Sequence, residues 1–103
     1  MIPKYESITG SPQIVAPLSY EESDAKITYF FYNSNEYEKN EYVEYLLNNG
    51  WTKTGTAVGG DSRGQSEQIA FSFKDSDGNS IAKLAISFFP ECSAVDLICV
   101  LKR

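Results

Sequence analysis

The stretch Asn48-Asn49-Gly50-Trp51 ends the one convincing helical pattern of the chain and begins its sheet. Glycine enters the left-handed backbone conformation at little cost, so Gly50, placed directly after an apolar helical stripe, predicts a helix end. Trp51 is positioned to pack back onto the last helical turn, as the hydrophobic contact of this C-terminal motif requires. These four residues therefore indicate an architecture, but they carry no chemistry.

The helix is predicted from about residue 35 to residue 49. Asn33 or Ser34 is expected to cap its N-terminus, where Glu36 and Glu38 suit the positive end of the helix dipole. At about 100° per residue, one arc forms a stripe in which the lysine is the only misfit: Lys39, Tyr42, Val43, Leu46 and Leu47. The opposite arc holds Tyr37, Asn40, Glu41, Glu44 and Asn48.

Five strands are predicted from β-branched and aromatic residues and from alternation, at residues 26–32, 51–58, 67–74, 80–89 and 94–102. Asp77-Gly78 indicates a hairpin turn at 75–79, residues 90–93 form a second turn, and the glycines within 57–66 favour a flexible loop. The order is β-α-β-β-β-β, which predicts an α+β fold with a mainly antiparallel five-stranded sheet and the helix on one face. The first strand either pairs parallel or lies at an edge.

Length and composition indicate a single folded domain, because 103 residues with 42% hydrophobic and 22% charged side chains can bury a core. We expect residues 1–25 to form an irregular arm packed on the domain, with a short edge strand at 13–16. Residues 26–103 form the α+β domain itself.

The net charge of −5 and the lack of a basic patch argue against a nucleic-acid partner. No apolar run approaches the roughly 20 residues that cross a bilayer, so membrane insertion is not expected. As written, the chain is expected to be cytoplasmic. If an N-terminal leader has been removed, the cell envelope or the extracellular space is expected instead.

An enzyme is not expected, because the chain has no histidine and therefore lacks the usual general base and the commonest transition-metal ligand. The Asp75-x-Asp77-Gly78-Asn79 run resembles the start of a calcium loop, but its twelfth position is Ile86 instead of glutamate. A hairpin turn explains the run, and weak surface calcium binding is the alternative. We predict no catalytic, cofactor-binding or metal residues and no cofactor.

Two further patterns contain residue types that can carry chemistry, the glycines at 55–64 and the two cysteines. Glycines near Lys53 and Arg63 suggest a phosphate cradle, but no helix follows them to receive a phosphate, so a hairpin loop is favoured. Cys92 in a turn and Cys99 in the last strand are too far apart along extended chain for a disulfide. Both are expected to be free thiols.

The candidate interaction surface rests on tyrosines and on a half-covered sheet. All seven tyrosines lie within the first 45 residues, and tyrosine is enriched at protein interfaces. One helix covers only part of one sheet face, which leaves apolar residues on the other, to be covered by the arm, a second copy of the chain or a partner. The predicted surface comprises Tyr37, Glu41, Glu44, Tyr45, Phe30, Tyr32, Phe89 and Ile98.

The chain resembles small α+β domains of uncharacterised Gram-positive envelope and lipoprotein-type proteins. The resemblance lies in Ile2-Pro3, the aromatic strand Tyr29–Tyr32, and the helix end Tyr42-x-x-Tyr45-Leu46-x-x-x-Gly50-Trp51. It implies a fold and raises the expectation of an envelope location, but it implies no activity, cofactor or catalytic residue.

Together these patterns predict a non-enzymatic binding or protein-interaction module with an unknown protein partner or a homodimer. The alternative is an acidic inhibitor or immunity-type protein that neutralises a basic partner, since charge sign and small size suit electrostatic steering.

Overall fold

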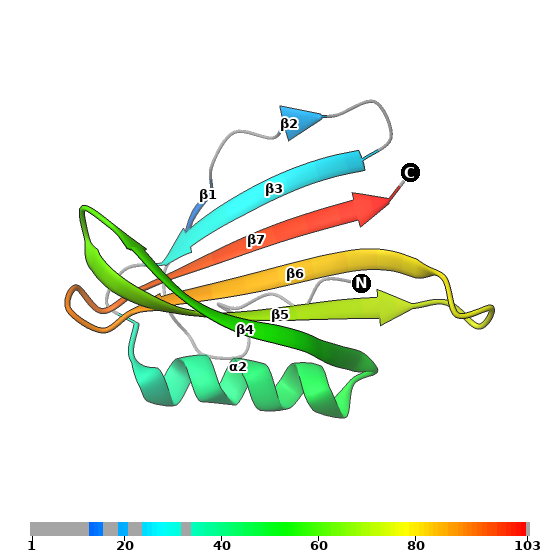
Figure 1. Cartoon of the computed structure of the whole chain (residues 1–103), viewed down its shortest axis with the longest axis horizontal. Coiled ribbons are helices and arrows are strands. Elements are labelled where there is room, and N and C mark those ends of the chain that lie inside the picture. Colours follow the sequence, from blue (N-terminus) through cyan, green and yellow to red (C-terminus); the bar gives the residue numbers. More distant parts are fainter. Residues whose placement is uncertain (1–12, 16–18, 21–23, 32–33, 103) are drawn as a thin grey trace.

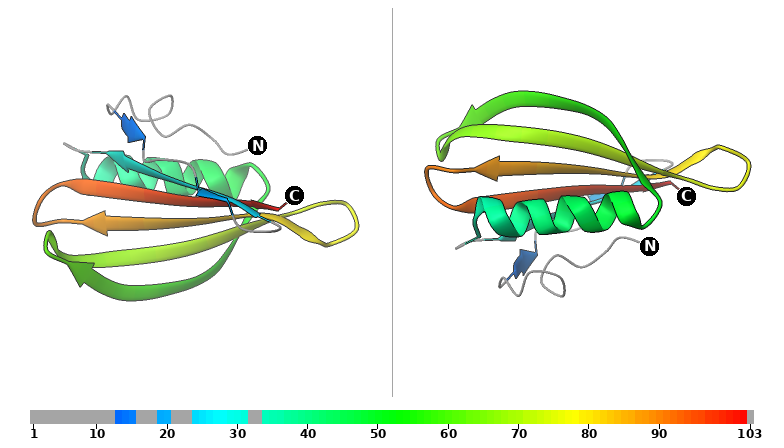
Figure 2. Two further views of the ribbon diagram at one scale, coloured as in Figure 1. Left: turned by 90° about the horizontal axis from the view of Figure 1, so that it is seen from above. Right: turned by 90° about the horizontal axis from the view of Figure 1, so that it is seen from below.

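The computed structural model describes residues 13–15, 19–20, 24–31 and 34–102. Five long antiparallel strands form one sheet in the spatial order β3-β7-β6-β5-β4, and the helix α2 lies along one face of it (Figures 1 and 2). The long elements are β3 (Asp24–Phe31), α2 (Glu36–Asn48), β4 (Trp51–Asp61), β5 (Gly64–Lys74), β6 (Ser80–Phe89) and β7 (Ala94–Lys102). The α+β architecture predicted from the sequence is confirmed.

The first long strand does not pair parallel to a neighbour, and it does not form an uncovered edge of the sheet. β3 pairs antiparallel with β7, with Phe30 opposite Asp96. Two short strands, β1 (Gln13–Val15) and β2 (Ser19–Tyr20), pair antiparallel with the outer side of β3. The short edge strand expected at 13–16 is therefore present as β1. The predicted arm of residues 1–25 also contains β2 and the first two residues of β3, and its residues 1–12, 16–18 and 21–23 lie outside the described residues.

The helix begins and ends at polar caps. Asn35, one residue later than expected, is the N-cap, and its side chain accepts a hydrogen bond from the Glu38 backbone N–H at 2.8 Å. Ser34 instead donates from Oγ to Glu38 Oε1 at 3.0 Å. At the other end Gly50 has φ +89°, the left-handed conformation that its position predicts.

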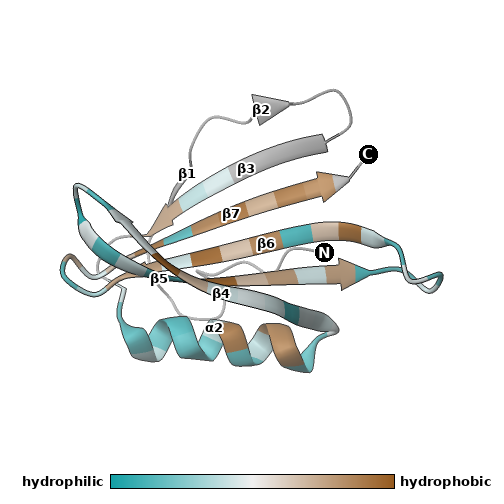
Figure 3. Cartoon of the chain, viewed as in Figure 1, coloured by the Kyte–Doolittle hydropathy of each residue, from teal (hydrophilic) through white to brown (hydrophobic). Residues whose placement is uncertain are grey.

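The core lies between α2 and the facing side of the sheet. Tyr42 and Leu46 are fully buried there, and Trp51 is buried in the same cluster with its ring 5.3 Å from that of Phe73. Alternation along the strands supplies the other side of the core, which includes Phe31, Phe71, Leu84, Ile86, Phe88, Val95, Leu97 and Cys99. Figure 3 shows this apolar band along β6 and β7 and the hydrophilic residues over the first turns of α2.

The loop predicted at 57–66 is wrong, because β4 runs to Asp61 and β5 starts at Gly64. Gly60 permits close strand contact, because a Cβ there would lie 2.7 Å from the Gly64 carbonyl oxygen. A Cβ at Gly59 would meet only the end of the Gln68 side chain, at 2.6 Å from its Nε2. The chain therefore turns tightly at Ser62 and Arg63, and this hairpin tip lies at the same end of the sheet as the β6–β7 turn (Figure 1).

No helix in the described part of the chain is long and apolar enough to cross a membrane.

Candidate functional site

The outer side of α2 presents the tyrosines and acids predicted for an interaction surface. Tyr37 is 73% exposed and Tyr45 is 41% exposed, Glu44 is exposed and Glu41 is half-buried. Spacings of three, four and seven residues bring Tyr37, Glu41 and Glu44 onto one side of a helix, and Tyr45 lies on its flank. The structure therefore brings these four predicted residues together, and we call them, with Glu36 and Glu38, the helix surface.

The charge on the helix surface is of one sign. α2 carries four glutamates and one lysine, and that lysine is 5% exposed. Lys39 lies on the core side, with Nζ 3.9 Å from Glu67 Oε2 and 5.6 Å from the centroid of the Phe88 ring. The apparent misfit in the stripe is thus a buried cation that snorkels to the edge of the core. It leaves no lysine or arginine exposed on the outer side of the helix.

Exposed apolar side chains are concentrated on the same helix. Among the described residues, the large hydrophobic side chains that are exposed are Tyr37, Tyr45, Leu47 and Val58, and the first three belong to α2. The prediction that Leu47 joins the core stripe is wrong, since it is 49% exposed. The buried side of α2 is narrow and consists of Lys39, Tyr42 and Leu46. Leu47 lies outside it, because it is rotated by about 100° around the helix axis from Leu46.

The remaining predicted surface residues do not join the helix surface. Phe30 and Ile98 are half-buried and lie on the second face, by which we mean the sheet face away from α2. Phe89 also lies on the second face but is only 3% exposed, so its place in an interaction surface is corrected. Tyr32 falls outside the described residues. The sequence-predicted surface therefore divides between opposite sides of the molecule.

Phe89 is buried because an arginine lies over it. The guanidinium carbon of Arg63, at the β4–β5 hairpin tip, is 4.0 Å from the centroid of the Phe89 ring and 6.0 Å from that of Phe30. Nη1 and Nη2 of Arg63 donate to the two carboxylate oxygens of Asp96 at 2.8 and 2.7 Å. Asp96 is 7% exposed. This bidentate pair holds the hairpin tip on the second face, and we call that region the closed end.

A second carboxylate completes the closed end. Asp61 accepts from the Arg63 backbone N–H at 2.7 Å and from its Nη2 at 2.8 Å. These hydrogen bonds from Arg63 lower the pKa of Asp61, and the hydrogen bonds to Asp96 and then to Asp61 raise the pKa of Arg63. Both carboxylates bind the Arg63 guanidinium, so the N–H groups that would bind a phosphate are engaged within the chain. The phosphate cradle considered from the sequence is therefore not present at this arginine.

Backbone conformation and close approach shape this hairpin tip. Gly64 has φ +111°, and a Cβ there would meet the Glu91 carboxylate of the β6–β7 turn. Only glycine combines that backbone conformation with so close a neighbour. The two hairpin tips are thereby packed against each other at the closed end.

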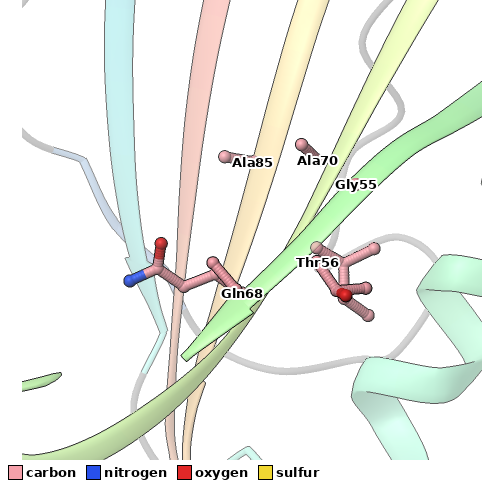
Figure 4. Close-up of a pocket in the computed structure, with 7 residues that line it drawn as sticks. Gly55, Thr56, Gln68, Ala70 and Ala85 are labelled. Atoms are coloured by element: carbon pink, nitrogen blue, oxygen red, sulfur yellow. The ribbon is translucent and has the colours of Figure 1, made fainter. Parts of the chain in front are cut away.

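The other part of the second face is hollow. Gly55, Ala70, Ala85 and Ile98 pair in register across β4, β5, β6 and β7, and three of these residues have little or no side chain. A hollow of about 420 Å³ is lined by Ala70, Ala85, Ile98, Val100, Ser72, Ser80 and Lys83, among others. A second, of about 220 Å³, shares Ala70 and Ala85 and extends to Gln68 and Gly55 (Figure 4). We call the two together the trough, and this part of the second face the open end.

The calcium-like run forms a hairpin turn, as predicted. Asp75 Oδ1 accepts from the backbone N–H groups of Asp77 and Asn79 at 2.9 and 3.0 Å, and Gly78 N–H donates to the Asp75 carbonyl. One carboxylate oxygen is thus engaged within the turn itself. Within the described residues, no cluster of three or more aspartate, glutamate, cysteine or histidine side chains is placed to hold a metal ion.

Both cysteines are free thiols. Cys92 is exposed in the β6–β7 turn, whereas Cys99 is buried in the core. Burial raises the pKa of the Cys99 thiol from 9.0 to about 12, because the thiolate would be desolvated. Cys99 therefore behaves as a small core side chain.

Sequence reasoning missed the Arg63–Asp96 pair. The two residues are 33 positions apart, and no local spacing connects them. The sequence does contain one signal, because Asp96 is the single acid among the apolar residues Val95, Leu97, Ile98 and Val100. A carboxylate that is buried at such a strand position needs a partner.

Comparison of the chain with protein-family models, with curated proteins and with solved structures finds no match in any of the three. The resemblance to Gram-positive envelope domains stays a prediction.

Proposed function

We propose that this chain is a non-enzymatic protein-interaction module that binds a basic protein surface through the helix surface. The observation that supports this most directly is the exposure of Tyr37, at 73%, on a helix that carries four glutamates and no exposed lysine or arginine of its own. Large exposed side chains that are not needed for the core are typical of contact surfaces.

The two residue types contribute different parts of the binding free energy. Tyrosine supplies a large contact area with a polar tip and loses little conformational entropy on binding. Exposed carboxylates mainly accelerate association with a positively charged partner, and they do so less as salt rises. Thirteen helical residues rise about 20 Å, so the surface is of a size suited to a modest, salt-dependent complex.

The same charge distribution supports the alternative of an inhibitor or immunity-type protein, in which the basic partner is an enzyme or toxin. It does not favour a homodimer through α2, because two acidic helix surfaces repel each other. Self-association would have to use the second face.

The test uses two matched charge reversals. Glu44→Lys on the helix surface and Asp77→Lys in the β5–β6 turn each replace an exposed carboxylate, so they change the net charge equally. A partner captured with the wild-type chain is purified, and its Kd for each variant is measured at low and high salt. We expect Glu44→Lys to weaken binding by about tenfold at low salt, Tyr37→Ala to weaken it at both salt concentrations, and Asp77→Lys to have little effect.

Equal weakening by Glu44→Lys and Asp77→Lys would show that only net charge matters, and the helix surface would then not be the contact. Loss of the partner's enzymatic activity on binding would identify the inhibitor alternative.

A further inference from the structure

The trough at the open end contains a charged group that the fold does not use. Lys83 is exposed on β6 and lines the larger hollow. Among the described residues it takes part in no ion pair, whereas Lys39 and Arg63 do. The exposed Lys53 and Lys74 are also outside these ion pairs, but neither lines the trough. By register Lys83 stands between Ser72 and Val100. An unpaired ammonium at the rim of an apolar hollow is a position for an anion.

A second polar group at the same hollow also lacks a partner. Ser80 lines the larger hollow, and its Oγ is the buried side-chain oxygen or nitrogen of the described residues that has no hydrogen-bond partner. Buried polar groups are nearly always hydrogen-bonded, and an unmet one costs free energy that a ligand can recover. Ser80 and Lys83 belong to the same end of β6, three residues apart. Ser80 pairs with Lys74 across an irregular step in the β5–β6 register, which brings it to the same face as the Ser72–Lys83 pair, and both residues line this end of the trough.

The rest of the trough is apolar and long. From the Ser72–Lys83 pair, the floor continues through the Ala70–Ala85 pair to Gln68, which is four residues along β5 from Ser72 or roughly 14 Å at the rise of a strand. Ala70, Ala85 and Ile98 supply the apolar lining, and Figure 4 shows Ala70 and Ala85 side by side on neighbouring strands. The larger hollow has a volume of about 420 Å³, within the range of small-molecule sites.

We propose that the trough binds a free aliphatic carboxylate of medium chain length. The carboxylate lies at Lys83 Nζ, and the Ser80 hydroxyl rotates from its buried position to donate to it. The hydrocarbon chain lies along Ala70, Ala85 and Ile98. The positive charge selects an anion over a cation of the same shape, while the small side chains of Ala70 and Ala85 leave room for a hydrocarbon tail. This site is separate from the helix surface and does not depend on the function proposed for it.

The experiment measures binding of sodium octanoate, below its micelle concentration, by isothermal titration calorimetry. Octylammonium chloride is the ligand control, because it has the same chain and the opposite charge. The protein variants are Lys83→Met, Lys83→Arg, Ser80→Ala and Ala85→Leu. Lys53→Met is the matched control, since it removes one exposed lysine from β4, outside the residues that line the trough.

We expect octanoate to bind the wild-type chain, and Lys83→Met to weaken that binding by about tenfold or more, as loss of a charge-assisted hydrogen bond does. Lys83→Arg should retain most of the affinity, Ser80→Ala should lose a smaller part, and Ala85→Leu should abolish binding by filling the floor. Lys53→Met should leave the affinity unchanged.

The proposal is overturned if octanoate does not bind the wild-type chain. It is also overturned if octanoate and octylammonium bind with equal affinity. The same holds if Lys53→Met weakens octanoate binding as much as Lys83→Met does. Circular dichroism and thermal unfolding of each variant separate loss of binding from loss of fold.

Discussion

The two ends of the second face each place a cation among apolar side chains, but only one of them completes its interactions. At the closed end Arg63 stacks on Phe89 and is held by Asp96 and Asp61. At the open end Lys83 lines the same hollow as Ala70 and Ala85 and takes part in no ion pair among the described residues. A cation whose charge is neutralised within the fold serves stability, whereas an unpaired cation above a hollow is available to a ligand.

The largest difference in stability between the two ends is expected when the cation at each end is replaced with methionine. Arg63→Met should destabilise the fold by about 2–3 kcal/mol, because it leaves the buried Asp96 carboxylate without its partner. Lys83→Met should change stability by no more than about 0.5 kcal/mol, as exposed substitutions usually do. Urea unfolding of both variants measures the difference.

A double variant checks the cause assigned to that loss. Arg63→Met combined with Asp96→Leu removes the stranded carboxylate along with the arginine, so it should regain most of the stability. If Arg63→Met costs no more than Lys83→Met, the closed end is not held by its ion pair.

A smaller effect is expected from adding one methyl group at each end. Gly64→Ala should cost about 1–2 kcal/mol, since φ is +111° and the new Cβ would meet the Glu91 carboxylate. Gly55→Ala should be nearly neutral, because nothing lies within 4 Å of its Cβ position. Thermal unfolding compares the two, and equal costs would mean that the closed end is no more tightly packed than the open end.

The smallest effect is a pH dependence at the closed end. The hydrogen bonds from Arg63 hold the pKa of Asp61 below its ordinary 3.8. A lowered carboxylate pKa contributes stability that is present above that value and is lost as the pH falls through the pKa of the folded state. The wild-type chain should therefore lose slightly more stability than Asp61→Asn when the pH falls from about 5 to about 2. If the wild type and Asp61→Asn lose stability in parallel as the pH falls, Asp61 does not contribute the expected pH dependence.

The sequence predicted the elements whose signals are local. Strands 80–89 and 94–102 were predicted with the bounds that the structure has, because alternation and flanking turns define them. Gly50 likewise marked the helix end correctly, since the left-handed conformation at C′ is a property of one residue. Both depend on neighbours in the chain and not on contacts across the sheet.

What the sequence did not show depends on strand pairing. Gly59 and Gly60 predict a loop from the sequence alone, whereas in the structure both lie in β4 and Gly60 lets the backbone of Gly64 approach closely within a hairpin. The Arg63–Asp96 pair and the row of Gly55, Ala70 and Ala85 exist only once the register is known. The helix surface needed only helical periodicity and was predicted from it, apart from the exposure of Leu47.

The most direct test of the difference between the two ends is a chemical-shift map of the ¹⁵N-labelled chain titrated with sodium octanoate, read at the arginine side chain as well as at the backbone. We expect progressive shifts at the amides of Ser80, Lys83, Ala85 and Ile98, with the Arg63 Nε–H and the Gly64 amide unmoved. Shifts centred on Arg63, or spread over α2, would contradict it.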